Sequence, residues 1–99
     1  MAKHKFLMHE EEDSVGVAVA DIEKGEKVYG AFLHGDKLVE VNSNDSIPLG
    51  HKIALKNVKD GEFVIKYGER IGKACKDIHV GDWVHTHNLK GYRWVKKEI

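Results

Sequence analysis

The chain is poor in cysteine and proline, with one of each in 99 residues. A single cysteine, Cys75, excludes a disulfide within the chain and a metal cage of cysteine thiolates. In the stretch GKACKD we expect Cys75 to be a small buried apolar residue. The proline, Pro48, biases the residue before it towards an extended backbone, and Gly50 follows as a flexible point. The pair His51-Lys52 is therefore presented on a turn.

The sequence also lacks an excess of either charge, since 16 lysines and arginines balance 16 aspartates and glutamates. A general nucleic-acid binder needs a basic surface to displace counterions, so we expect no nucleic-acid partner. No apolar stretch is long enough for a signal peptide or a membrane span, and we expect a cytoplasmic protein with no membrane contact. The segment 90–99 is locally basic, and we interpret it as a solvated tail.

The short length predicts one domain with a modest core and little room for a large enclosed active site. This favours a module, or a subunit that completes its site with a partner. Strand-like segments alternate with turn residues at 4–9, 14–22, 27–33, 37–42, 63–68 and 82–88. We therefore expect a mostly β fold with a core of about 6–89. One or two short helical turns are also expected, one of them near 51–58.

Three eight-residue units share one form: DIEKGEKV (21–28), NVKDGEFV (57–64) and DIHVGDWV (77–84). Each has an aliphatic residue second, glycine fifth, an acid sixth and valine eighth. The aliphatic residue anchors a turn in the core, the glycine permits a positive φ angle, and the valine begins the next strand. We predict three similar corners that lead from a turn into a strand.

Two histidines, His85 and His87, lie one residue apart in the stretch GDWVHTHNLK. If 83–88 is extended, both share a face with Trp83, with their Cα atoms roughly 6.5–7 Å apart. Two imidazoles at this spacing can converge on a divalent ion, although zinc and iron sites usually need more ligands. Further ligands could come from another chain or from His9, Asp13 and His51. The competing interpretation is a solvent-facing strand end with ordinary hydrogen bonds.

Three stretches in order, IPLGHKIAL, VIKYGERIGKACKDI and GDWVHTHNLK, resemble the small N-terminal segment of the altronate and galactarate dehydratases. The opening HEEEDSVGVAV is similar to the start of the same family. This segment is similar to SAF domains, and the resemblance runs from about His9 to Leu89. It implies a single SAF-like domain over 1–99 with a β-clip fold of short strands folded back on themselves.

The resemblance also implies lyase chemistry, the elimination of water from a sugar acid, with Fe2+ or another divalent metal. The larger catalytic region of those dehydratases is not in this sequence, which implies a small subunit that acts with a separate large subunit. The small subunit of sulfolactate sulfo-lyase also resembles this chain, so release of sulfite is an alternative. A stand-alone SAF-type module that binds carbohydrates or other anions without catalysis is a second alternative.

The chemistry explains why such residues are wanted. Removal of a proton next to a carboxylate creates an enediolate-like charge that needs a metal or a cationic partner. Histidine suits the acid or the base role because its pKa lies near neutrality, and lysine can neutralise a carboxylate or sulfonate. Carried over position by position, the resemblance implies His51 and Lys52 in catalysis, Lys52 and Asn88 in substrate binding, and His9, His85 and His87 as metal ligands.

Overall fold

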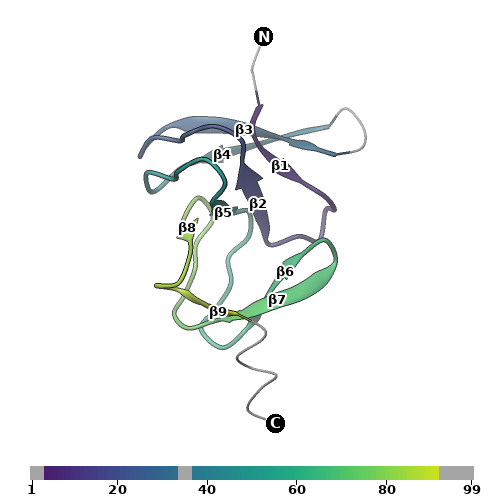
Figure 1. Ribbon diagram of the computed structural model, residues 1–99, viewed down its shortest axis with the longest axis vertical. Helices are drawn as coiled ribbons and strands as arrows, with labels where there is room; N and C mark the ends of the chain where they lie inside the picture. The colour runs from purple at the N-terminus through teal and green to yellow at the C-terminus, as the bar shows by residue number, and fades with distance from the viewer. Residues whose placement is uncertain (1–3, 34–36, 92–99) are drawn as a thin grey trace.

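The computed structural model describes residues 4–33 and 37–91, which form nine β-strands (Figure 1). The strands are β1 (His4–Met8), β2 (Val15–Ala18), β3 (Lys27–Phe32), β4 (Leu38–Asn42), β5 (Lys52–Ala54), β6 (Phe63–Lys66), β7 (Glu69–Ala74), β8 (Trp83–Val84) and β9 (Leu89–Gly91). The mostly β class is confirmed. The described residues contain no helix, and the helical turn expected near 51–58 is wrong, because β5 begins that segment and Val58 ends it with a β-bridge to Ile78. Nothing in these two ranges could cross a membrane as a helix.

The strands form two sheets. The larger has the order β4-β3-β1-β2-β5-β8, and the smaller has the order β6-β7-β9. Neighbours are antiparallel except β1 and β3, which are parallel. In Figure 1 the β6–β7 hairpin lies below β1 and β2, at the end of the molecule nearer the C-terminus. The hairpin expected between 27–33 and 37–42 is confirmed by the pairing of β3 with β4.

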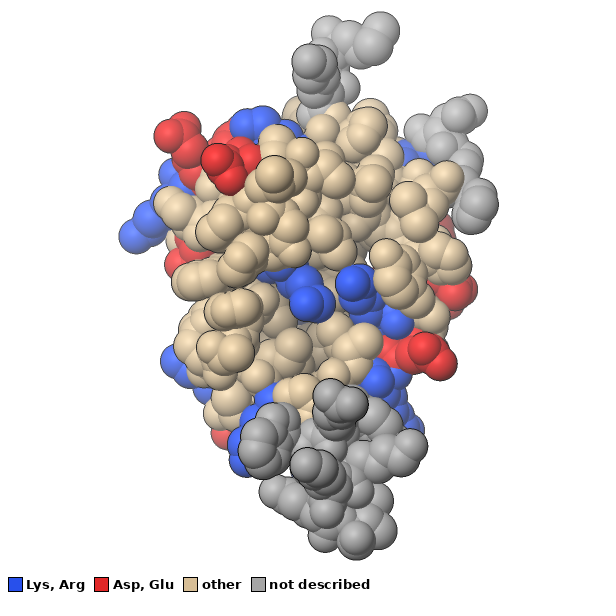
Figure 2. All heavy atoms as spheres, in the orientation of Figure 1, with Lys and Arg blue, Asp and Glu red and all other residues tan. Residues whose placement is uncertain are grey.

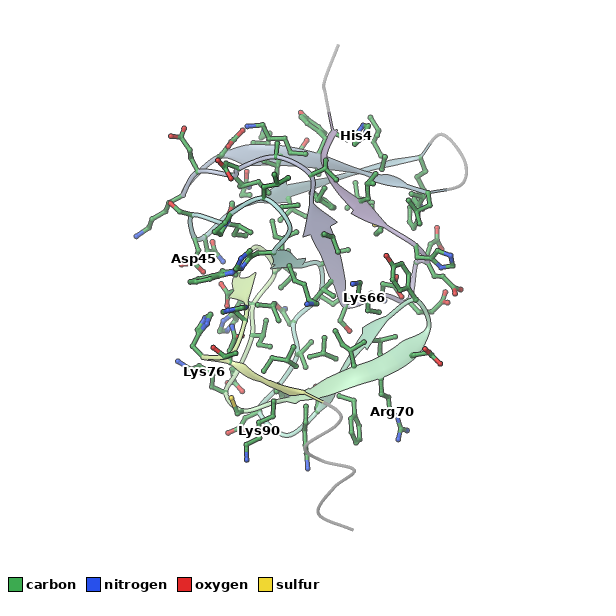
Figure 3. All side chains as sticks on the ribbon, in the orientation of Figure 1. His4, Asp45, Lys66, Arg70, Lys76 and Lys90 are labelled. Atoms are coloured by element: carbon green, nitrogen blue, oxygen red, sulfur yellow. The ribbon has the colours of Figure 1, made fainter. Side chains whose placement is uncertain are left out.

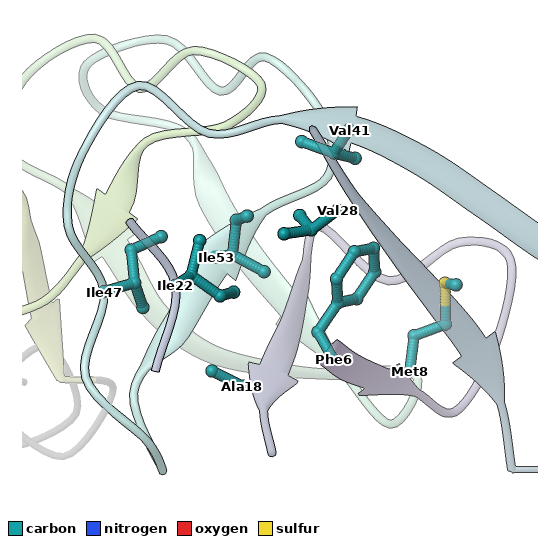
Figure 4. Packing of buried hydrophobic residues seen from close by; sticks show 8 residues of the cluster. All are labelled: Phe6, Met8, Ala18, Ile22, Val28, Val41, Ile47 and Ile53. Carbon is teal, nitrogen blue, oxygen red and sulfur yellow. The ribbon is translucent and has the colours of Figure 1, made fainter. Parts of the chain in front are cut away.

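Two apolar clusters fill the space around these sheets. The first holds Phe6, Met8, Ala18, Ile22, Val28, Val41, Ile47 and Ile53 (Figure 4). The second holds Val15, Ala54, Val58, Val64, Ala74, Ile78 and Val84. Successive residues on β5 contribute to different clusters because side chains alternate along a strand. Gly30 is required by this packing, since a Cβ atom there would lie 1.8 Å from Cε1 of Phe6.

The three predicted corners are confirmed. Their glycines, Gly25, Gly61 and Gly81, have φ angles of 84°, 91° and 94°. In each corner the acid in the sixth position accepts a hydrogen bond from the backbone N–H of the third residue, at 2.9, 2.9 and 2.8 Å for Glu26, Glu62 and Asp82. The second and eighth residues are buried in all three. Local chemistry therefore fixes these turns, as the repeated sequence form indicates.

The structure also contains a fourth corner, SIPLGHKI (46–53), which was not predicted because it lacks the acid of the repeated eight-residue form. Its glycine, Gly50, has a φ angle of 88°, and its second residue, Ile47, forms an isolated β-bridge with Ile22 of the first corner. The second and third corners are joined by a matching bridge. In this fourth corner the sixth residue is His51 instead of an acid, and the third is Pro48, which has no N–H to be satisfied. The His51 side chain therefore has no N–H of the third residue to cap.

Two further predictions concern Cys75 and the segment 90–99. Cys75 was expected to be buried, and this is wrong: it is exposed directly after β7, while its neighbour Ala74 takes the buried place. Successive residues of an extended chain point to opposite faces, so Cys75 is exposed where Ala74 is buried. Of the predicted basic tail, Lys90 and Gly91 belong to β9, and residues 92–99 lie outside the described residues.

Candidate functional site

Three histidine side chains surround one indole at the junction of β5 and β8, and we call His51, Trp83, His85 and His87 the imidazole cluster. Trp83 Nε1 donates a hydrogen bond to Nδ1 of His51 at 3.1 Å. The His85 ring stacks on the indole, with centroids 5.3 Å apart and an interplanar angle of 7°, and lies 4.8 Å from the His51 ring. The His87 ring lies 5.2 Å from the indole. The fold thus brings together His51, His85 and His87.

The route of the chain through this cluster differs from expectation. The prediction that 83–88 is extended is wrong, because β8 ends at Val84 and residues 86–88 form a turn. The cause is Asn88, which is buried: its Oδ1 accepts the N–H of His85 at 2.9 Å, and its Nδ2 donates to the carbonyl of Trp83 at 2.8 Å. Asn88 therefore holds the turn that carries the two histidines, and its contact with substrate stays a prediction.

We expect Asn88→Ala to lower the free energy of unfolding by about 1–3 kcal/mol, because it leaves two part-buried backbone groups without their hydrogen-bond partner. Urea denaturation of the full chain measures this. Asn44→Ala is the matched control, since Asn44 Nδ2 also contacts two acceptors, at 3.0 and 2.9 Å, but is exposed. Equal losses in the two variants would show that the Asn88 turn has no special importance.

The hydrogen bond from Trp83 determines what His51 can offer. An indole N–H is only a donor, so Nδ1 of His51 must be the acceptor and carries no proton. In a neutral imidazole the proton then lies on Nε2. His51 therefore presents an N–H donor on its free edge, and it cannot bind a metal through Nε2 while this bond persists.

A second polar region is the cleft between β2 and the β6–β7 hairpin, a cavity of about 240 Å³. The Ser14 N–H donates to the carbonyl of Ile65 at 2.8 Å, and the Ile65 N–H donates to Ser14 Oγ at 3.1 Å, which fixes the hairpin against the start of β2. The lining includes Leu7, His9, Asp13, Val17, Lys66 and Tyr67. In Figure 3 Lys66 is labelled near the middle of the molecule, between the upper strands and the hairpin.

Asp13 ties the two walls of this cleft together. Its carboxylate accepts the N–H groups of His9, Glu10 and Gly68 at 3.3, 3.1 and 3.1 Å. Burial raises the pKa of Asp13, but backbone hydrogen bonds from Gly68, Glu10, Tyr67 and His9 outweigh it, so the pKa lies below its usual value. Asp13 is thus a buried anion that joins the loop after β1 to the tip of the hairpin.

Tyr67, at that tip, was missed as a site residue. Its φ angle of 56° lies in the left-handed region, which is uncommon for a residue other than glycine. The conformation places its ring edge-on to the His9 imidazole, with centroids 5.0 Å apart at 89°. The Tyr-Gly pair between two apolar runs was the available signal for a tight hairpin turn.

The Lys52 side chain lies on the face of the large sheet that lines the cleft. Cross-strand pairing aligns Leu7, Val17 and Lys52, and the first two of these line the cavity. Paired residues of neighbouring strands share a face. Burial lowers the pKa of the Lys52 ammonium, and the nearby charge of Lys66 lowers it further. A half-buried lysine under these conditions is suited to bind an anion.

The predicted metal ligands do not come together within this chain. His9 lies in the cleft beside Asp13 and Tyr67, whereas His85 and His87 lie on Trp83. Across residues 4–33 and 37–91, no three histidine, cysteine or acidic side chains are grouped so that they could hold a metal ion. These residues therefore do not fit a complete metal centre, and ligation by His9, His85 and His87 stays a prediction that requires another chain.

Short strands, paired corners and an open cleft with apolar walls and a few polar side chains define this molecule as a small all-β domain with polar side chains available to a ligand. The model of the altronate/galactarate dehydratase SAF domain family matches residues 4–92, and the chain belongs to this family. The expected resemblance is confirmed, and so is the SAF-type fold.

Curated relatives divide into two kinds. The chain is 38% identical over 90 residues to (2R)-sulfolactate sulfo-lyase subunit alpha of Chromohalobacter salexigens, covering 90% of this chain and 96% of that protein. It is 60% identical over 48 residues to the subunit of the same name from Paracoccus pantotrophus, covering 48% and 72%. It is 39% identical over 85 residues to altronate dehydratase of Bacillus subtilis, covering 86% of this chain but 16% of the relative. The relatives are thus lyases, either as a named subunit or as a much longer chain.

Proposed function

We propose that this chain is the small subunit of a two-component lyase that removes a leaving group from a small hydroxy acid. The observation that supports it best is His51, an imidazole oriented by Trp83 at the one corner of the four where no acid is present. The half-buried ammonium of Lys52 follows it in the chain and lies on the other face of the large sheet. The alignment with relatives that are named as lyases or lyase subunits supports the same chemistry.

The proposed reaction is an elimination next to a carboxylate. A base takes the proton from the carbon beside the carboxylate, and the C–H electron pair forms a carbon–carbon double bond. The leaving group then departs from the next carbon with its bonding pair, as hydroxide or sulfite. The Nε2–H of His51 donates to the group that becomes negative, and a cationic group of the assembled site offsets the carboxylate and the enediolate-like charge. The base comes from the partner subunit.

Two leaving groups are candidates. Loss of water from a sugar acid would resemble altronate dehydratase, and loss of sulfite from sulfolactate would resemble the sulfo-lyase. The observation that favours the second candidate is the alignment with 96% of a sulfo-lyase alpha subunit. In either case Fe2+ or another divalent metal is part of the proposal only as a group held with the partner. A stand-alone anion-binding module remains the alternative outcome of the test.

Co-expression with a large lyase component of the same organism tests the proposal. We expect the two chains to co-purify and the complex to convert altronate or sulfolactate, with turnover lost when the small chain is omitted. Both acids are assayed on one preparation, which separates the two leaving groups. Unchanged turnover without this chain, together with no association, would rule out a subunit role. Binding of acids by the chain alone, with no lyase activity in any mixture, would indicate the stand-alone module.

A further inference from the structure

Two lysines, Lys66 in the cleft and Lys52 on the strand beside it, differ from the other lysines that the structure describes near acids. Lys5, Lys37 and Lys27 lie 2.6, 2.8 and 3.7 Å from carboxylate oxygens of Glu26, Glu11 and Glu40. Lys52 and Lys66 are less exposed than Lys27 and Lys37, yet neither forms an ion pair with any carboxylate of residues 4–33 and 37–91. Cations that are partly removed from water are normally paired, so this arrangement requires an explanation.

Position indicates that the two ammonium groups serve one cavity. Lys66 lines it directly, with Nζ 4.9 Å from the centre of the Tyr67 ring. Lys52 extends the cross-strand row of Leu7 and Val17, which form the opposite wall. Figure 2 shows blue side chains side by side in the hollow across the middle of this face. The two charges are near enough for Lys66 to affect the titration of Lys52.

The acid that lines the same cavity does not neutralise this pair. Asp13 is 1% exposed, and its oxygens already accept backbone N–H groups from both walls. An anion held by several N–H donors needs no further cation, because those dipoles offset its charge. Two like charges therefore face an apolar-walled space, and a ligand with negative charge would remove the repulsion between them.

We propose that the cleft binds a small organic acid with two anionic groups, one paired with Lys52 and the other with Lys66, while Tyr67 forms a wall. The inference rests on the proposed function, because it names the class of substrate that the lyase would take. A volume of about 240 Å³ suits such an acid, since pockets for drug-sized ligands occupy roughly 300–1,000 Å³. Lys66 and Tyr67 thereby become substrate-binding residues.

Calorimetric titration of the full chain with a matched pair of acids tests this inference. Sulfolactate has a carboxylate and a sulfonate, whereas lactate has the same three carbons and only the carboxylate. At pH 7 and low salt we expect sulfolactate to bind with a Kd of about 1 mM and lactate at least about tenfold more weakly. Lys52→Met and Lys66→Met should each abolish the difference between the two acids. Lys59→Met, at an exposed lysine of the second corner, should leave it unchanged.

Each outcome decides the inference. Equal affinity for the two acids, a preference that survives Lys66→Met, or no binding of sulfolactate up to about 10 mM would overturn it. These results are separate from the fate of the proposed function. If the complex is active but the small chain binds both acids equally, the lyase function is supported and the two-anion site is refuted. A preference that depends on both lysines, without turnover in any complex, keeps the site and removes the lyase.

Discussion

Replacement of His51 by asparagine should lower turnover of the assembled lyase by about 10²–10³-fold, the usual effect of removing one donor to a developing negative charge. Asparagine is chosen because its Oδ1 can replace Nδ1 as the acceptor for the Trp83 indole N–H, 3.1 Å away in the present structure. The variant then retains the packing of the imidazole cluster and loses only the Nε2–H donor. Steady-state kinetics of the complex with its preferred acid gives the measurement.

His79→Asn is the control, because His79 is an exposed histidine outside the imidazole cluster, with Nδ1 3.7 Å from Oδ2 of Asp82. It should retain wild-type turnover. Trp83→Phe tests the positioning of His51: without the indole donor the ring is free to change tautomer, so the pH profile of turnover should change as well as its maximum. Full activity of His51→Asn in a complex that assembles normally would refute the donor role.

The second large effect concerns stability. Asp13→Asn should reduce the free energy of unfolding by about 2–4 kcal/mol, because hydrogen bonds to a charged group are stronger than those to a neutral one and buried donors lose their acceptor. Since an amide presents N–H₂ where a carboxylate presents oxygen, one set of backbone N–H groups would face another donor. Both the loop after β1 and the hairpin tip should loosen. Urea denaturation at pH 7 measures the loss.

The pH dependence follows from the same residue. The pKa of Asp13 is lower in the folded chain than in the unfolded chain, so the unfolded state binds the proton more readily. The stabilisation is fully present above the unfolded value of about 3.9 and is lost as the pH falls from there towards the folded value. The difference in stability between wild type and Asp13→Asn should therefore narrow below about pH 4. Asp60→Asn, at an exposed aspartate, should show neither effect.

Six of the strands (β1, β2, β3, β4, β6 and β8) and three corners could be predicted from the sequence because their signals are local, whereas β5, β7 and β9 were not predicted. Glycine in a fixed place, an acid that caps a nearby N–H, and an aliphatic residue on either side act within eight residues. The fourth corner escaped because Pro48 and His51 replace the capped and capping residues. The turn after β8 escaped because Asn88, buried among tertiary contacts, overrides the β tendency of the residues before it.

Prediction of the site was similarly divided. The ordered stretches led to His51, Lys52, His85 and His87, and the structure gathers the three histidines around Trp83. His9 was grouped with them, although it lies with Tyr67 in the cleft. Lys66 and Tyr67 could not be found from sequence, because their importance depends on which wall of the large sheet the β6–β7 hairpin covers. Such packing has no signature within one segment.

The fourth corner has a chemical consequence. In the other three corners the side chain of the sixth residue accepts a hydrogen bond from the N–H of the third residue. Replacing it would therefore lower the stability by about 1 kcal/mol. Pro48 in the third place has no N–H, so the sixth residue of this corner does not have to accept a hydrogen bond. Its side chain can therefore take part in chemistry without loss of the turn. The histidine at this place in the stretch IPLGHKIAL is therefore not required by the backbone path, which leaves it available for chemistry.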